Sequence, residues 1–331
     1  MFTRTPATDA AYRSRARQIE ASASIAAGRE LSPIEVARHL MARTDLDYDS
    51  FRQYRASLTA AWEGAAEQFP GKEAEYSAAI ELMGSRRDKP APQAKKKLRT
   101  SQYKQKGITE DELERICHGA WATGLPNGRA LVAYLQAGVL AGARFCEWPT
   151  ANFGPSQMPG FKFQLTFGNG KHSNGRAHGE TRTLLWEDLP KDLERALRSW
   201  IKISTKAARE GKHKRLQGTL GDLMHRVTED LFRRDRQRRP TLSSVRDAAV
   251  ARWKQAYIAG AKTNEEKQCG RAIVAALMGH ASDESATKHY ARARKGSKYP
   301  TPFADPVEVN RVLQRYKAPT FKITEHKPPS P

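Results

Sequence analysis

The sequence predicts a mainly α-helical protein with one small antiparallel β-sheet, arranged in two domains. Three observations support this fold class. Apolar residues recur at helical spacing along most of the chain, whereas residues 161–186 contain the alternation that is typical of β-strands. A basic segment, 86–107, interrupts both patterns and divides the chain. The length of 331 residues also suits two domains better than one.

The chain is strongly basic, with 57 Lys and Arg residues against 36 Asp and Glu residues and a formal net charge of +21. Such an excess favours a polyanionic partner, because each phosphate that Lys or Arg neutralises releases condensed counterions. We therefore predict binding to nucleic acid. On charge alone, a generally basic cytosolic protein or a ribosome-associated protein is the alternative.

The cysteines and the apolar stretches exclude several other classes of protein. Cys117, Cys146 and Cys269 lie far apart, which excludes a disulfide scaffold and a zinc site built on paired cysteines. No apolar stretch approaches the length needed to span a membrane, and the first residues lack the apolar core of a secretory signal. We therefore expect a cytoplasmic protein that does not contact membranes.

The first domain is expected to be small and helical, over residues 29–85. Residues 1–28 are predicted to form a mobile tail that becomes helical toward its end. The third helix of the domain is predicted around residues 74–83. Its first two helices are predicted from capping boxes, Ser32 with Glu35 and Ser50 with Gln53.

The segment 86–107 is predicted to be a linker, because it has two prolines and too few apolar residues to bury a core. We favour a role as a strap that lies along DNA phosphates; a solvated spacer is the alternative. The residues predicted to contact phosphate are basic: Lys95, Lys96, Lys97, Arg99, Lys104 and Lys106.

The second predicted domain, 108–300, begins at the capping box of Thr109 with Glu112. Alternating apolar residues at 161–167, a turn rich in Gly and Asn, and a second run at 181–186 predict a β-hairpin. Helices are predicted at 110–122, 128–141, 190–208, 219–234, 243–258, 271–278 and 284–292.

The most informative segment lies near the end of this domain. A hydrophobic helix stops at Gly279, exposes His280, and is followed ten residues later by Tyr290, with Thr287 between them. Here the sequence resembles the tyrosine recombinases, also called the phage integrase family. Their signature is a Leu/Met-Gly-His turn followed by a threonine and a tyrosine, and in many members the histidine and the tyrosine lie nine residues apart.

The other elements of the family pattern occur upstream, in the expected order. Arg144 with Glu147 matches an Arg-x-x-Glu that follows a helix and precedes the hairpin. Lys171 lies in the predicted hairpin turn, where the family has a lysine. Arg246 matches the arginine of a His-x-x-Arg, but Ser243 stands where the histidine is usual.

The resemblance implies a catalytic set without a metal or another cofactor. Tyr290 would attack a DNA phosphate and form a 3′-phosphotyrosine, so that rejoining needs no ATP. Arg144 and Arg246 can stabilise the negative charge of the five-coordinate phosphorane with paired donors. Lys171 can protonate the leaving 5′ oxygen. His280 can donate a hydrogen bond to the phosphate.

Ser243 is where this sequence departs from the family. A serine can donate a hydrogen bond to a phosphate but cannot act as a general base at neutral pH, and it is also a natural helix N-cap. His172, His178 and His289 are candidate substitutes. The departure leaves open a DNA-binding protein of the same fold with impaired catalysis. A type IB topoisomerase or telomere resolvase is a third interpretation, against which the separate helical domain argues.

The resemblance also implies an organisation and partners. The first domain would be a helical core-binding domain that binds DNA, and 108–300 a mixed α/β catalytic domain. The protein would be a site-specific recombinase or integrase of a mobile element, associated with double-stranded DNA. It would act as a homotetramer linked through the C-terminal tail, 301–331, with accessory directionality proteins. One helical stretch is predicted in that tail, at 307–316.

Overall fold

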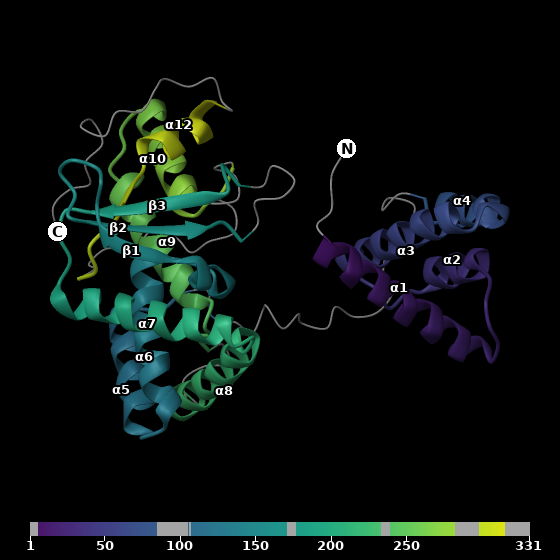
Figure 1. Ribbon diagram of the computed structural model, residues 1–331, viewed down its shortest axis with the longest axis horizontal. Helices are drawn as coiled ribbons and strands as arrows, with labels where there is room; N and C mark the ends of the chain where they lie inside the picture. The colour runs from purple at the N-terminus through teal and green to yellow at the C-terminus, as the bar shows by residue number, and fades with distance from the viewer. Residues whose placement is uncertain are drawn as a thin grey trace. The chain divides into compact units, whose positions relative to one another are not determined.

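The chain forms two compact units, 1–98 and 99–331, each with its own hydrophobic core (Figure 1). The computed structural model describes residues 6–84, 105, 107–170, 177–232, 239–281 and 298–314. The mainly helical fold with one small antiparallel sheet, which the sequence predicts, is confirmed.

The described part of the first unit is helical. Phe51, Leu58 and Trp62 are buried in its core. The predicted capping box of Ser32 with Glu35 is confirmed, because each side chain accepts a hydrogen bond from the backbone N–H of the other. The elements are α1 (Pro6–Ala27), α2 (Pro33–Ala42), α3 (Tyr48–Gln68), the 3₁₀ turn η1 (Pro70–Lys72) and α4 (Glu73–Leu82).

Two predictions for this unit are wrong. The second helix, α3, is capped by Asp47 rather than Ser50, because the Asp47 carboxylate accepts the Ser50 N–H at 2.8 Å and places Ser50 inside the helix. Residues 6–27 are not a tail but the helix α1. Ala16 and Ile19 are among its buried residues, and α1 packs against α3.

The second unit surrounds a four-stranded antiparallel sheet of order β1-β2-β3-β4. The predicted hairpin pairs Leu165 with Leu184. Figure 1 shows α10 and α12 close together beside the sheet, and α7 near β1. The strands are β1 (Asn152–Pro155), β2 (Phe163–Gly168), β3 (Thr181–Trp186) and β4 (Phe303–Ala304). The helices are α5 (Glu110–Ala122), α6 (Pro126–Ala141), the 3₁₀ helix η4 (Phe145–Thr150), α7 (Lys191–Arg209), α8 (His213–Phe232), α9 (Ser244–Tyr257), α10 (Asn264–Leu277) and α12 (Pro306–Gln314).

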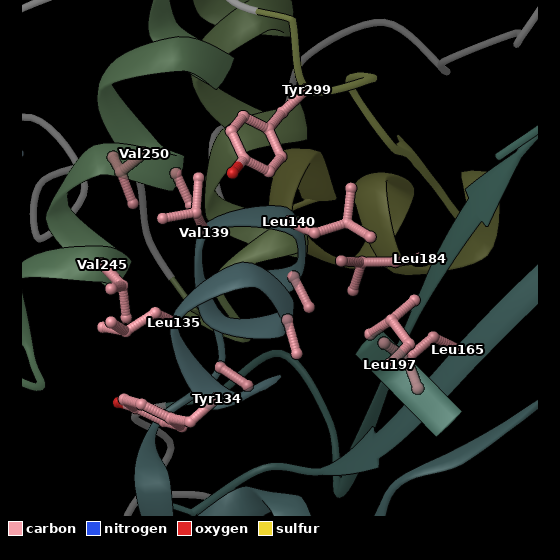
Figure 2. Packing of buried hydrophobic residues seen from close by; sticks show 14 of the residues in the cluster. Tyr134, Leu135, Val139, Leu140, Leu165, Leu184, Leu197, Val245, Val250 and Tyr299 are labelled. Atoms are coloured by element: carbon pink, nitrogen blue, oxygen red, sulfur yellow. The ribbon is translucent and has the colours of Figure 1, made fainter. Parts of the chain in front are cut away.

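Helix α6 is the centre of this core. Its buried side chains lie between Val245 and Val250 of α9 on one side and Leu165 and Leu184 of the sheet on the other (Figure 2). Because α6 is enclosed on several sides, it is apolar over most of its surface rather than along one stripe. Because its neighbours hold α6 on several sides, the C-terminal end of α6 has a defined position. This end leads into Arg144 of the candidate site.

Several elements of the second unit differ from the predictions. Helix α8 begins at His213 rather than 219, and α10 begins at Asn264 rather than 271, after a capping box of Thr263 with Glu266. The strands β1 and β4 were not predicted. The helical stretch expected at 307–316 is confirmed over its described residues by α12. Residues 303–314 are nevertheless not a tail, because the buried apolar side chains of β4 and α12 belong to the core. Residues 315–331 and the predicted helix 284–292 lie outside the described residues.

Candidate active site: arginines around Glu147

Arg144 is positioned by the sharp end of α6. The helix terminates at Gly142, whose φ of 58° is left-handed and favours glycine. A Cβ there would also lie 2.5 Å from the Trp253 ring, so no larger residue fits without displacing it. Arg144 then starts the 3₁₀ helix η4. Its backbone N–H and its guanidinium donate to the two Glu147 carboxylate oxygens at 2.7 and 2.6 Å.

Glu147 is the hub of the site. It is 1% exposed, and it also accepts a hydrogen bond from Arg182 at 2.7 Å and one from the Gly170 N–H at 3.2 Å. Arg246 lies 3.7 Å from the same carboxylate. Burial alone would raise the pKa of Glu147, but attraction to Arg182, Arg246 and Arg144 outweighs burial and holds the pKa well below its usual range.

Arg246 joins the ends of two helices. It is 6% exposed and projects from the first turn of α9. Its guanidinium donates to the Gly142 carbonyl at the end of α6. It also donates to the Met278 carbonyl at the end of α10, at 3.0 Å. A guanidinium has several donors in a fixed plane, so one side chain can hold both carbonyls. The arginine therefore brings the two helix ends that carry Arg144 and His280 together.

His280 follows α10 and the left-handed Gly279, whose φ is 68°. Its Nε2 lies 3.1 Å from an Arg144 guanidinium nitrogen. Because arginine can only donate, Nε2 must accept, and Nδ1 carries the proton of a neutral imidazole. Burial, together with the charges of Arg246, Arg144 and Arg182, lowers the pKa of His280 to about 3.

The charges of this cluster do not balance. Among the described residues, the guanidiniums of Arg144, Arg182 and Arg246 all pair with the carboxylate of Glu147, so these four side chains carry three positive charges and one negative charge, a sum of +2, beside a neutral His280. A buried surplus of this size is costly unless an anion neutralises it. The arrangement is therefore suited to bind an anion such as a phosphate.

The structure brings three predicted site residues together, namely Arg144, Arg246 and His280. Ser243 is exposed at the N-cap position of α9, but its side chain makes no capping hydrogen bond and its hydroxyl lies 3.1 Å from the Thr241 hydroxyl. Within the described residues, no hydrogen bond joins Ser243 to the Glu147 cluster. Ser244 instead supports the helix start, accepting from the Thr241 N–H at 3.0 Å.

The candidate substitutes for the missing histidine are only partly described. The His178 side chain is buried, and its Nε2 lies 3.1 Å from the Ala276 carbonyl of α10. Burial lowers the pKa of His178 to about 4, so it is a neutral donor to that carbonyl. This contact gives His178 a structural role. Lys171, His172, His289 and Tyr290 lie outside the described residues.

The predicted DNA-contacting residues of the linker also lie outside the described residues: Lys95, Lys96, Lys97, Arg99, Lys104 and Lys106. Their role remains a prediction.

Sequence reasoning missed Arg182, which is fully buried in β3 and donates to Glu147 and to Asn169. A signal was present in the sequence. Arg182 is in phase with Leu184 and Trp186, so its side chain points to the buried face of the strand. A charge at such a position requires a buried counter-charge.

Two further properties of the described residues bear on the site. No group of three or more His, Cys, Asp or Glu side chains in the described part of the chain could hold a metal ion. None of its helices combines the length and the apolar character needed to cross a membrane.

Comparison with known proteins finds similarity only among solved structures, since no family model and no curated protein matches the chain. A lambda integrase dimer bound to a COC′ core site is similar, with a TM-score of 0.49 and 15% identity, covering 90% of this chain and 75% of that chain. The XerH site-specific recombinase bound to a palindromic difH substrate, in a post-cleavage complex, has a TM-score of 0.43 and 13% identity, covering 86% of this chain and 73% of that chain. With both TM-scores below 0.5, neither likeness by itself identifies a function.

Proposed function

We propose that this protein is a site-specific DNA recombinase, an integrase of a mobile element that cuts and rejoins DNA through a 3′-phosphotyrosine. The observation that supports the proposal most strongly is the cluster of Arg144, Arg182 and Arg246 around Glu147, with His280 in contact with Arg144. The net charge of +21 adds general attraction to DNA.

The geometry suits a phosphodiester in two ways. Arg144 is the most accessible arginine of the cluster, with its side chain 20% exposed, so it can reach a phosphate while Glu147 holds it in place. Paired guanidinium donors stabilise the negative charge that accumulates on the nonbridging oxygens of a phosphorane. Arg246, held at two carbonyls, would add the second guanidinium.

His280 would change its role when a phosphate binds. Its Nε2 accepts from Arg144. An anion between the two side chains would compensate the positive charges that lower the pKa of the imidazole, so His280 could then donate to the phosphate.

The remaining roles in the proposal come from the family pattern. Tyr290 would attack the phosphate and Lys171 would protonate the leaving 5′ oxygen. The reaction would require no ATP, because the phosphotyrosine conserves the bond energy. It would require no metal, because the guanidiniums supply the positive charge that stabilises the phosphorane. Ser243, in the place of a histidine, would contribute at most a hydrogen bond. The protein would act on double-stranded DNA as a tetramer, with accessory proteins that set the direction.

A second candidate is a DNA-binding protein of the same fold with impaired catalysis. The exposed Ser243, which lacks the acid–base capacity of a histidine, favours it. One experiment separates the two. The purified protein is incubated with DNA that flanks its coding sequence, denatured, and analysed for protein-linked DNA. We expect an adduct with the wild type and none with Tyr290→Phe, which should still bind DNA. Binding by both proteins without an adduct would support the second candidate.

A further inference from the structure

We propose that Arg182 is a positioning residue of this site: it neutralises Glu147 from the buried side, so that Arg144 and Arg246 keep their charge for a phosphate, and it locks the β2–β3 hairpin onto the turn that carries His280. This inference deepens the proposed function and rests on it. Arg182 itself would not touch DNA, because its side chain is completely buried.

The first step of the argument is electrostatic. Glu147 must be ionised to orient Arg144 through two hydrogen bonds. With Arg144 and Arg246 alone, one carboxylate against two guanidiniums would leave a surplus of +1, half of the +2 that is present. Arg182 therefore accounts for half of the net positive charge of the described side chains that pair with Glu147. Its contribution is persistent, since its guanidinium is held 2.7 Å from Glu147 and lies over the Phe167 ring at 4.8 Å.

The second step is geometric. The other branch of the Arg182 guanidinium donates to the Asn169 side-chain oxygen at 2.8 Å. Asn169 closes the hairpin where the strands meet the loop, because its side-chain nitrogen donates to the carbonyls of Gly179 and Thr181 at 2.9 and 3.0 Å. Arg182 thus connects Glu147, on η4, with the residues that hold β2 and β3 together.

The third step places His280 against this assembly. Gly279 precedes His280, and a Cβ at Gly279 would lie 2.0 Å from the Asn169 oxygen and 3.0 Å from the Arg182 guanidinium. The backbone of the turn therefore packs directly on the Arg182–Asn169 pair. A shift of Arg182 would move Glu147, the loop end of the hairpin and the His280 turn together, whereas loss of its charge would change the electrostatic potential at the imidazole.

Arg252 offers a matched control, because it is also a buried arginine of this unit, 7% exposed, with different contacts. It donates to the carbonyls of Val139 and Leu140 at 3.1 and 3.2 Å. Arg252 is not among the charges that shift the pKa of His280, whereas Arg182 is. Replacing either arginine by methionine removes a buried guanidinium, but only Arg182→Met alters the charge around Glu147.

The test compares Arg182→Met, Arg182→Lys and Arg252→Met with the wild type, at a temperature at which each is folded by circular dichroism. NMR titration of the His280 imidazole, assigned with His280→Gln, should give a pKa about one unit higher in Arg182→Met, as expected for removing one nearby charge. Inorganic sulfate should bind at least about tenfold more weakly to Arg182→Met. Arg252→Met should match the wild type in both measurements, and Arg182→Lys should retain the pKa of His280.

On DNA, Arg182→Met should lower the rate of adduct formation at least about tenfold while DNA affinity stays within about twofold, since phosphate contacts elsewhere dominate binding. The rate of adduct formation in Arg182→Lys should lie between those of Arg182→Met and the wild type, because lysine keeps the charge but lacks the forked donor geometry. Equal pKa, sulfate affinity and cleavage in Arg182→Met and Arg252→Met would overturn the inference. If Arg182→Met does not fold, a wild-type adduct rate in Arg182→Lys would overturn it.

Failure of the proposed function has a different signature. The wild type could form no adduct on DNA while Arg182→Met still shows the shifted His280 pKa and the weaker sulfate binding. That result would support the electrostatic role of Arg182 and contradict the proposed strand cleavage.

Discussion

Gly279 provides a sharp test of how the His280 turn is built. The residue has a φ of 68°, and a Cβ there would approach the Asn169 side-chain oxygen to 2.0 Å. Asn169 is 2% exposed and hydrogen-bonded to the loop end of the hairpin and to Arg182, so it cannot move aside without losing hydrogen bonds. Gly279→Ala should therefore destabilise the second unit through two separate effects.

The magnitude follows from adding these effects. A left-handed backbone costs a residue with a Cβ about 1–2 kcal/mol. Displacing Asn169 breaks its hydrogen bond with the charged Arg182, which costs about 1.5–3 kcal/mol. The sum predicts a loss of roughly 2.5–5 kcal/mol in the free energy of unfolding. Gly211→Ala is the matched control, because Gly211 has a φ of 67° but no neighbouring atom within 4 Å of the point where the alanine Cβ would lie.

Urea unfolding followed by tryptophan fluorescence is a suitable assay, because five of the six tryptophans, all but Trp62, belong to the second unit. Gly211→Ala should lose only about 1–2 kcal/mol, the backbone contribution. If Gly279→Ala and Gly211→Ala lose the same amount, the close packing of the His280 turn on Asn169 and Arg182 is refuted.

Three further predictions concern stability, chemistry and DNA binding. Burial raises the pKa of Glu308 from 4.5 to about 8. Protonated Glu308 therefore stabilises the fold fully below about pH 4.5, and this stabilisation is lost as pH rises through 8. In urea unfolding, Glu308→Gln should lose less stability than the wild type between these two pH values. Arg246→Lys should reduce adduct formation at least about a hundredfold with DNA affinity retained, because one ammonium cannot replace a planar pair of donors, and an unchanged rate would contradict its role. Replacing Lys95, Lys96 and Lys97 by glutamine should weaken binding on all DNA sequences and reduce the slope of log affinity against log salt by about 3; an unchanged slope in a filter-binding titration would make the linker a spacer.

Local signals in the sequence predicted much of the fold. The capping boxes at Ser32 and Thr109 placed helix starts correctly, because the cap hydrogen bonds involve residues three apart and need no tertiary information. Residues 264–270 are largely polar and show no clear apolar period, so the sequence predicts a start for α10 that is seven residues later than the observed start at Asn264. The strand β4 has two residues, and it depends on pairing with the distant β3, which local patterns cannot reveal.

Of the candidate site, too, only the part that depends on local contacts could be predicted from spacing in the sequence. Arg144 and Glu147 contact each other across one turn, so their spacing alone was informative. Arg246 and His280 converge on them only through the packing of α6, α9 and α10, and the family pattern rather than local physics identified them. Arg182 was missed because its partner, Glu147, lies 35 residues earlier in the chain.

The most direct measurement of the central claim is to identify the atom that carries DNA. The trapped protein–DNA complex would be digested with protease and nuclease, and the peptide that retains a nucleotide would be sequenced by tandem mass spectrometry. We predict a nucleotide joined through its 3′ phosphate to Tyr290. A linkage to another residue, such as the buried Tyr299 of the core, or a 5′ linkage would contradict the proposed chemistry.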